Sequence, residues 1–432
     1  MEEDFYWLWI CNIDKVWNAT IRRILNIFGT PREAFIVSEK VLRSELSKIA
    51  GMNEKVINII VQSRNREAVW RLHEKLNQKG VRFIHCESRE YPIKLRHINH
   101  YPYGLYIKGC IADLSGVIDG EKRHTVSIVG ARNCTAYGRK MAGDLGYELA
   151  TKGVNVVSGM AVGIDGAGHW GALRACHMQK NIHIGGSVVG KICDMQEYKN
   201  VKVPNEYISN EYIPNEYISD ECISNECTPG KSTEAGITIA VLGSGVDICY
   251  PIQNFELYQN IMQNGIVISE YPLGTKPMAW QFPQRNRIIS GLSDRIIVVE
   301  AREKSGSLIT VEYGLEQGKD IYAVPGRIGD SLSSGCNRLI QEGAGILTNT
   351  ENIMRELELG ELYPCKISKN KNIVLEKDLE LVYSCVDYFP KSVEYIIEET
   401  GMEMTQVYRN IITLQLMGLI DEQTKNHYVR TW

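Results

Sequence analysis

The chain has 432 residues, of which 44% are hydrophobic and 23% charged, which is ordinary for a globular protein with two or three domains. No apolar run approaches the roughly 20 residues that cross a bilayer, and the acidic start Met1-Glu2-Glu3-Asp4 is unlike a secretory signal. The 12 cysteines include no Cys-x-x-Cys pair, which argues against structural zinc or a disulfide framework. We therefore expect a cytoplasmic protein with reduced thiols and without a metal or an organic cofactor.

The net charge of −4 is unevenly distributed along the chain. Residues 205–235 contain seven acidic residues and one lysine, so this segment carries −6 and the remainder sums to +2. The charge outside this segment is therefore compatible with a nucleic-acid partner, but it is too small for a large basic surface.

Residues 1–75 are predicted to form a small helical domain of the sterile-alpha-motif or helix–hairpin–helix type. Apolar residues recur at helical spacing from Ile21 to Phe28 and again further along the chain. A DNA-binding helix–hairpin–helix unit needs glycines in its hairpin, so that the backbone can approach phosphate. Residues 13–18 supply none, and a packing module is therefore the better interpretation.

Residues 76–124 are predicted to be a connector with some strand character. From residue 125 to 357 the expected secondary structure has another pattern. Short apolar strands alternate with helices there, and small residues follow the strands, which predicts a doubly wound α/β sheet covered on both faces. Such sheets bind ligands beyond the carboxyl ends of their strands, where these small-residue turns fall. The predicted strands are 126–129, 154–157, 237–242, 266–269, 295–300 and 321–324.

Residues 177–236 interrupt this domain with an acidic, low-complexity insertion. From Asn205 onward it holds five copies, two of them degenerate, of a unit like Asn-Glu-Tyr-Ile-Ser. The copies are compatible with a pentapeptide β-helix or with a mostly disordered surface segment. The second interpretation is favoured, because five charged units are too few to build a core.

A linker, residues 358–375, precedes a C-terminal module over residues 376–432. Three helical segments followed by a hairpin give the order of a winged helix. Arg409 is the main base on the helix that would read a duplex. A role in protein contact or dimer support is therefore at least as well supported as duplex reading.

The strongest functional signal is a cluster of arginines and rings that follows Trp280 and ends in a hydroxyl-rich turn. Guanidinium groups bind phosphates bidentately, rings stack on bases, and the N–H groups that open a helix bind anions. Together these features predict a polyanion site, and nucleic acid is the polyanion that also offers bases. The candidate residues are Phe282, Arg285, Asn286, Arg287, Ser305, Gly306, Ser307 and Thr310.

For each arginine alone, an ion pair with a carboxylate such as Asp294 or Glu300 is a competitive alternative. The group as a whole favours anion binding, so that replacing both Arg285 and Arg287 by alanine is expected to weaken binding and leave the fold intact.

Turns after the predicted strands add Gly130, Arg132, Gly159 and Gly243 to the candidate nucleic-acid site. Gly130-Ala131-Arg132 either holds a phosphate on its backbone N–H groups or is an ordinary turn with a surface arginine. Gly243 begins a dinucleotide-like fingerprint whose last glycine is replaced by Ile248, which argues against a nicotinamide or flavin site.

Asp165 and His169 are four residues apart and fit one face of a helix. They form either an acid/base pair or a structural cap with a histidine satisfied nearby. The structural interpretation is favoured, because no nucleophile or set of metal ligands accompanies them.

In order and spacing, motifs of residues 127–173 and 238–354 resemble those of the DNA-processing protein A family (DprA/Smf). The resemblance covers the α/β core and, more loosely, the two flanking modules. The matching pieces include Gly130-Ala131-Arg132, Val157-Ser158-Gly159, Gly163-Ile164-Asp165, Tyr250-Pro251, Phe282-Pro283, Arg285-Asn286-Arg287, Ser305-Gly306-Ser307-Leu308-Ile309-Thr310 and Val324-Pro325-Gly326.

The resemblance implies an extended Rossmann-like domain that binds single-stranded DNA, dimerises, protects incoming strands in natural transformation and helps load the RecA recombinase on them. It implies strand contacts at Arg132, Phe282, Arg285, Asn286 and Arg287. Two departures are Ala131, where the family often has serine, and the acidic insertion.

The resemblance also implies a non-catalytic protein. The alternative is a nucleotide-processing Rossmann enzyme of the phosphoribohydrolase kind. That chemistry usually carries a Pro-Gly-Gly-x-Gly-Thr turn, whereas this chain has Val324-Pro325-Gly326-Arg327.

Overall fold

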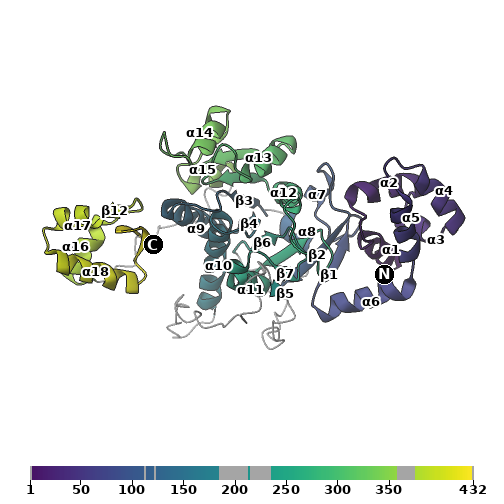
Figure 1. Cartoon of the computed structure of the whole chain (residues 1–432), viewed down its shortest axis with the longest axis horizontal. Helices are drawn as coiled ribbons and strands as arrows, with labels where there is room; N and C mark the ends of the chain where they lie inside the picture. The colour runs from purple at the N-terminus through teal and green to yellow at the C-terminus, as the bar shows by residue number, and fades with distance from the viewer. Residues whose placement is uncertain are drawn as a thin grey trace.

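The computed structural model describes residues 2–110, 113–120, 123–183, 213–214, 235–357 and 375–430. Figure 1 shows the N-terminal helices at one end of the long axis, an α/β sheet with its helices in the middle, and a small C-terminal module at the other end.

The N-terminal part consists of helices whose starts are fixed by short polar side chains. Thr30 accepts a hydrogen bond from the Glu33 amide and Pro31 occupies the first turn, so that α3 begins where the Gly-Thr-Pro sequence stops α2. Trp7 and Trp9, each 2% exposed, lie in its core. The helices are α1 (Glu2–Cys11), α2 (Asn18–Phe28), α3 (Pro31–Ile36), α4 (Glu39–Ser47), α5 (Glu54–Ser63) and α6 (Arg66–Gln78).

A nine-stranded sheet with the order β1-β2-β8-β6-β4-β3-β9-β10-β11 forms the centre of the molecule. The strands from β8 to β11 are parallel, whereas β1 and β2 add an antiparallel edge. The strands are β1 (Arg82–His85), β2 (Gly104–Gly109), β3 (Thr125–Val129), β4 (Asn155–Ser158), β6 (Thr238–Val241), β8 (Ile266–Ser269), β9 (Arg295–Val298), β10 (Asp320–Ala323) and β11 (Gly345–Ile346).

This topology confirms the predicted Rossmann-like, doubly wound α/β class. The chain order reverses between the neighbours β3 and β9, the kind of switch point at which such sheets open a crevice. The sequence placed strand character in the connector, and β1 and β2 show that this segment belongs to the main sheet.

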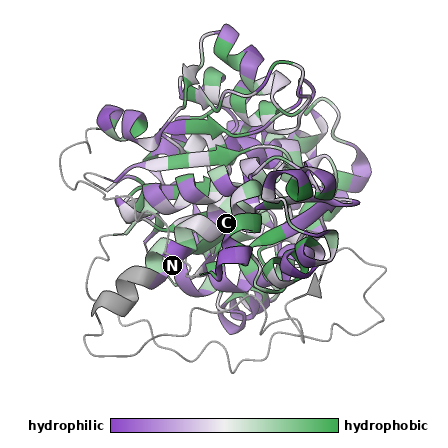
Figure 2. Cartoon of the chain, turned by 90° about the vertical axis from the view of Figure 1, so that its left-hand side faces the viewer, coloured by the Kyte–Doolittle hydropathy of each residue, from purple (hydrophilic) through white to green (hydrophobic). Residues whose placement is uncertain are grey.

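Helices cover both faces of the sheet, because successive strand residues point to opposite sides. Ile297 packs in one cluster with Ala142 and Leu145, whereas its neighbours Ile296 and Val298 pack in another with the helix that follows β8. In Figure 2 the helices carry both hydrophilic and hydrophobic stretches, as elements with one face on a core should. The main covering helices are α9 (Ala136–Thr151), α10 (Ile164–His183), α11 (Phe255–Asn264), α12 (Gln281–Leu292), α13 (Ser307–Glu316), α14 (Ser334–Gln341) and α15 (Thr350–Glu356).

Short elements complete the central part. β7 (Ile248–Cys249) pairs with β5 (Ile213–Pro214), and the remaining short helices are α7 (Ile93–Arg96), α8 (Leu114–Ile118) and η4 (Ile252–Asn254). Apart from β5, the repeat segment lies outside the described residues. α10 runs to His183, inside the range assigned to the insertion.

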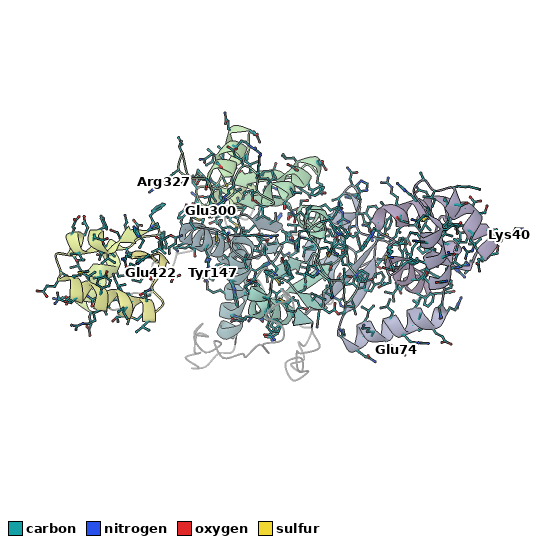
Figure 3. All side chains as sticks on the ribbon, viewed as in Figure 1. Lys40, Glu74, Tyr147, Glu300, Arg327 and Glu422 are labelled. Atoms are coloured by element: carbon teal, nitrogen blue, oxygen red, sulfur yellow. The ribbon has the colours of Figure 1, made fainter. Side chains whose placement is uncertain are left out.

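The C-terminal module has its own apolar core and a three-stranded sheet with the order β12-β14-β13. Its Phe389 ring stacks on Tyr137 of the central part at 6.3 Å and lies 3.9 Å from the Arg327 guanidinium. Figure 3 labels Arg327 on the central part and Glu422 in the module. The elements are α16 (Lys377–Cys385), β12 (Lys391–Ser392), α17 (Val393–Thr400), α18 (Met404–Leu416), β13 (Ile420–Thr424) and β14 (His427–Arg430).

Candidate nucleic-acid interface

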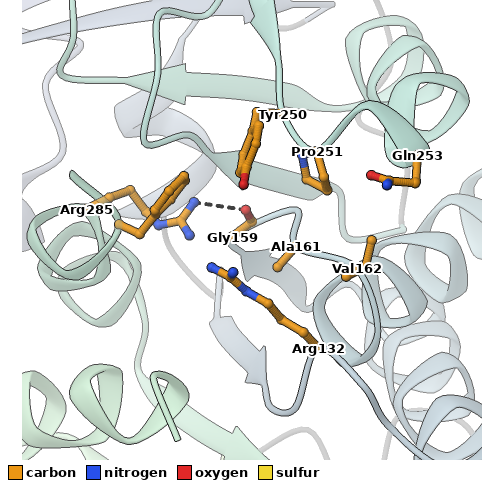
Figure 4. A pocket seen from close by; sticks show the side chains of 9 residues that line it. Arg132, Gly159, Ala161, Val162, Tyr250, Pro251, Gln253 and Arg285 are labelled. Atoms are coloured by element: carbon orange, nitrogen blue, oxygen red, sulfur yellow. Dashed lines mark hydrogen bonds between the residues drawn. The ribbon is translucent and has the colours of Figure 1, made fainter. Parts of the chain in front are cut away.

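A small pocket lies beyond the carboxyl ends of β3, β4 and β6, the edge at which the fold class places ligands. Its volume is about 200 Å³ and it is open to one side. Figure 4 shows Arg132 and Arg285 reaching toward each other across it, with Tyr250 and Pro251 above them. The lining residues are Arg132, Gly159, Ala161, Val162, Tyr250, Pro251, Gln253, Phe282 and Arg285.

One wall of the pocket is an aromatic rim, defined here as Arg132, Tyr250 and Phe282. The Tyr250 and Phe282 rings stack at 5.3 Å with an interplanar angle of 26°, and the Arg132 guanidinium lies 5.7 Å from the Phe282 ring. Phe282 fits because Gly243 has no side chain: a Cβ there would lie 2.8 Å from the ring. Rings beside a cation give a base a surface to stack on and its phosphate a charge.

Arg132 is exposed and, among the residues that the structure describes, has no carboxylate within ion-pair distance. Its guanidinium therefore keeps its hydrogen-bond donors available for a phosphate. The turn before it does not offer both of its amides, because the Ala131 N–H donates to the Glu300 carbonyl at 2.7 Å. The predicted phosphate site at the Gly130 turn therefore loses the Ala131 N–H and keeps the Arg132 side chain.

Two buried arginines of α12, Arg285 and Arg287, are called the arginine floor here; Arg285 lines the pocket, whereas Arg287 lies outside its lining. Arg285 is 5% exposed, and its Nη1 donates to the carbonyls of Gly159 and Val241, which end β4 and β6. A Cβ on Gly159 would lie 2.4 Å from this guanidinium, so glycine is needed there for packing. Arg285 thus lines the pocket and also bonds the fold: its Nε donates to Asn286 and its Nη1 to the two carbonyls, whereas its Nη2 has no hydrogen-bond partner among the described residues.

Arg287 is 4% exposed and forms a bidentate ion pair with Glu270, at 3.0 Å and 2.6 Å. Burial alone would lower the pKa of Arg287, but the charge and hydrogen bonds of Glu270 outweigh it and raise the pKa. Asn18 of α2 donates to the same carboxylate at 3.2 Å, which ties the N-terminal helices to α12. The pairing alternative expected from the sequence is therefore correct for Arg287, although its partner is Glu270 rather than Asp294 or Glu300.

Asp165 and His169 lie beneath the floor and do not contact each other through a hydrogen bond. The Gly159 amide donates to Asp165, while His169 Nδ1 lies 2.6 Å from the Thr238 hydroxyl. Burial raises the pKa of Asp165 against the opposing charge of Arg285, and burial and then Arg285 lower the pKa of His169 to about 3. The burial of both residues and the partners of Asp165 and His169 Nδ1 fit the structural interpretation, whereas His169 Nε2 is buried without a hydrogen-bond partner among the described residues.

The hydroxyl-rich turn before α13 lies outside the pocket lining. The Asn286 amide donates to the Gly306 carbonyl at 3.4 Å, Ser305 and Ser307 bond each other at 2.7 Å, and Thr310 is 1% exposed. Four of the predicted residues, Arg132, Gly159, Phe282 and Arg285, thus meet at the pocket, with Gly243 directly behind Phe282. Asn286, Arg287 and the α13 turn support it from outside.

Tyr250, Pro251 and Gln253 line the pocket and were missed as site residues from the sequence. Tyr250-Pro251 was available as a motif, but nothing local in the sequence says that this tyrosine, directly after β7, stacks on Phe282.

None of the lining side chains is a carboxylate. Among the described residues, no group of three or more His, Cys, Asp or Glu side chains is arranged to hold a metal ion. The same part of the chain contains no helix with the length and apolar content of a membrane span.

Fold and pocket together define a Rossmann-like protein with a cationic, aromatic pocket at the carboxyl edge of its sheet. The family model for DNA recombination-mediator protein A matches residues 82–229 and 220–358, and the chain belongs to this family.

Comparison with individual proteins and with a solved structure agrees with this family assignment. The chain is 34% identical over 280 residues to the DNA processing protein DprA of Bacillus subtilis (strain 168), which covers 65% of this chain and 72% of that protein. It is 26% identical over 461 residues to the protein Smf of Synechocystis, which covers 99% of each. The X-ray structure of DNA processing protein A from Streptococcus pneumoniae matches with a TM-score of 0.57 and 26% identity, over 82% of this chain and 97% of that one.

Proposed function

We propose that the chain binds single-stranded DNA at the aromatic rim and acts as a mediator in DNA recombination. The observation that carries this proposal is an exposed arginine without an ion-pair partner among the described residues, placed against two stacked rings in a pocket lined by no carboxylate. A cavity of about 200 Å³ is too small for a double helix but admits a flat ring from an unpaired strand.

Binding through one rim arginine and ring stacking is expected to be salt-dependent and tolerant of sequence, since every base has a flat face. The candidate contacts are Arg132, Tyr250 and Phe282. Arg285 and Arg287 are proposed to hold the rim in place, because Arg285 bonds the carbonyls of Gly159 and Val241 and Arg287 bonds Glu270.

Membership of the recombination-mediator family supports a finer proposal. The chain is proposed to protect incoming single strands in the cytoplasm during natural transformation, to act as a homodimer and to help load the RecA recombinase. A pull-down of RecA with and without single-stranded DNA tests the loading step. Recovery of RecA that does not change when DNA is present would point instead to an adaptor for which DNA binding is secondary.

The C-terminal module is proposed to be a winged-helix-like element that contacts protein rather than duplex DNA. α17 carries three glutamates and no base, and α18 carries Arg409 as its only charged side chain. A helix face with so little positive charge gives little affinity for a phosphate backbone.

The decisive experiment titrates the purified protein with single- and double-stranded oligonucleotides of the same sequence at two salt concentrations. We expect tighter binding of the single strand, an affinity that falls with salt, and a loss in Phe282→Ala. The matched control is Arg71→Ala, which removes an exposed arginine of α6 that is paired with Glu67 far from the rim. Equal affinity for both oligonucleotides, or an unchanged affinity in Phe282→Ala, would reject the proposal.

The rival function is hydrolysis of nucleotides at the same pocket. No lining carboxylate is placed to act as a general acid or nucleophile, and Asp165 is buried under Arg285. Release of free base from nucleoside monophosphates by the purified protein would favour this rival.

A further inference from the structure

A second group of rings lies at the junction between the N-terminal helices and α12. We call Trp17, Tyr271 and Trp280 the aromatic platform. The ring centroids of Trp17 and Trp280 lie 5.1 Å apart, and Tyr271 lies 6.3 Å from the first and 6.2 Å from the second. The residue before α2 and the connection between β8 and α12, which are far apart in the sequence, therefore bring their rings to one place.

The two tryptophans of the platform are exposed. Trp17 is 46% and Trp280 47% exposed, whereas Tyr271 beneath them is 3% exposed. Tryptophans that serve only packing in the same N-terminal helices, Trp7 and Trp9, are 2% exposed. The platform thus presents two large rings to solvent above a buried one, and the three rings meet edge to face at interplanar angles of 70°, 78° and 83°.

The platform adjoins the candidate strand site. Trp280 immediately precedes α12, and Phe282 of the rim is the second residue of that helix. The N-terminal contribution is fixed to the same helix, because Asn18 next to Trp17 bonds Glu270, and Glu270 bonds Arg287. The two tryptophans and Phe282 are therefore held by one rigid connection, and a strand leaving the rim across the start of α12 meets the platform.

The charges of the segments that carry the platform suit a polyanion. The exposed charged side chains next to Trp17 and in the loop before Trp280 are Asp14, Lys15 and Lys276, together with Arg22 one turn into α2. Three cations against one anion favour a phosphate backbone.

We propose that the aromatic platform is a second stacking subsite for unpaired bases, so that a bound strand runs from Arg132 and Phe282 across the start of α12 to Trp17 and Trp280. This inference rests on the proposed binding of single-stranded DNA. It adds the direction of the strand on the surface and assigns the N-terminal helices a part in binding.

The test compares affinities for oligothymidines of roughly 4 to 16 nucleotides, the range over which one binding site is filled. In Trp17→Ala plus Trp280→Ala we expect an unchanged affinity for the shortest oligonucleotide, which fills the rim alone. For the longer ones we expect a loss of roughly tenfold or more, as for loss of base stacking. Trp70→Ala is the matched control, because Trp70 of α6 is 53% exposed and is not part of the platform.

A conservative variant separates stacking from packing. Trp17→Phe plus Trp280→Phe keeps two flat rings, so it should bind long oligonucleotides within about threefold of the parent chain. It should lose most of the quenching of tryptophan fluorescence that the parent shows when DNA binds.

The inference is overturned if the alanine variant binds long oligonucleotides as the parent does, or if quenching persists in the phenylalanine variant. It is also overturned if the alanine variant loses equal affinity for every length. If instead the proposed binding of single-stranded DNA is wrong, the unmodified chain will bind no oligonucleotide of any length.

Discussion

The aromatic rim and the arginine floor both contain arginine, yet their arginines are placed in opposite ways. Arg132 is exposed and rests against a ring, whereas Arg285 and Arg287 are 5% and 4% exposed and bonded within the fold. An arginine-rich motif can therefore contain residues that stabilise the fold around a site. Arg285 and Arg287 fix the strand ends and the domain junction on which the rim depends.

The largest effect that this comparison predicts is on the stability of Arg287→Ala. The change removes the charged partner of Glu270, whose side chain is 11% exposed and keeps its bond from Asn18, and breaking a largely buried pair in this way costs about 3–5 kcal/mol of unfolding free energy. Chemical denaturation measures it, and Arg71→Ala, at an exposed pair, serves as the control. An unchanged midpoint together with lost DNA binding would show that Arg287 acts on the ligand instead.

Arg285→Ala is expected to be destabilising by on the order of 3 kcal/mol, because two carbonyls lose their donor and Asp165 loses its neighbouring charge. Arg285→Lys should not restore the loss, since an ammonium cannot reproduce the fork of a guanidinium. Full recovery of the melting temperature in the lysine variant would contradict this role.

A pH titration of stability tests the buried side chains under the floor. The folded pKa of His169 is lowered to about 3 from 6.5, so the unfolded chain binds more protons between these values. This contribution to stability is present above pH 6.5 and is lost as the pH falls. The parent should lose about 1–2 kcal/mol from this group between pH 6.5 and pH 5, relative to His169→Asn. Parallel stability curves for the two chains would contradict the burial of a neutral imidazole.

The smallest effect on stability is expected for Arg132→Ala, within about 0.5 kcal/mol, since the side chain is exposed. Its affinity for single-stranded DNA should nevertheless fall roughly tenfold, and the slope of log affinity against log salt should drop by about 1. A stability loss as large as that of Arg285→Ala would remove the distinction between rim and floor.

The sequence predicted the sheet well because its signals are local. Apolar strands such as Val126 to Val129, each followed by small residues, specify alternating strands and helices without knowledge of their neighbours. The order of the strands fits the class, and the match to the Streptococcus pneumoniae structure agrees with it.

Only part of the site was predicted, because the burial and bonding partners of each arginine depend on contacts between distant segments. Arg285 bonds Gly159, which is 126 residues away, and Asn18 reaches Glu270 over 252 residues. Neither partner is visible from local spacing. The expectation that replacing Arg285 and Arg287 leaves the fold intact is replaced by a structural role for both residues, and Tyr250 is added to the site.

The most direct test is photocrosslinking of a single-stranded oligonucleotide that carries 5-iodouracil, with the adducts mapped by mass spectrometry. An unpaired base on the rim predicts adducts at Phe282 or Tyr250, lost in competition with unlabelled single strands and weakened in Arg132→Ala. Adducts found only in the C-terminal module, or distributed evenly over the surface, would contradict the placement of the strand at this edge of the sheet.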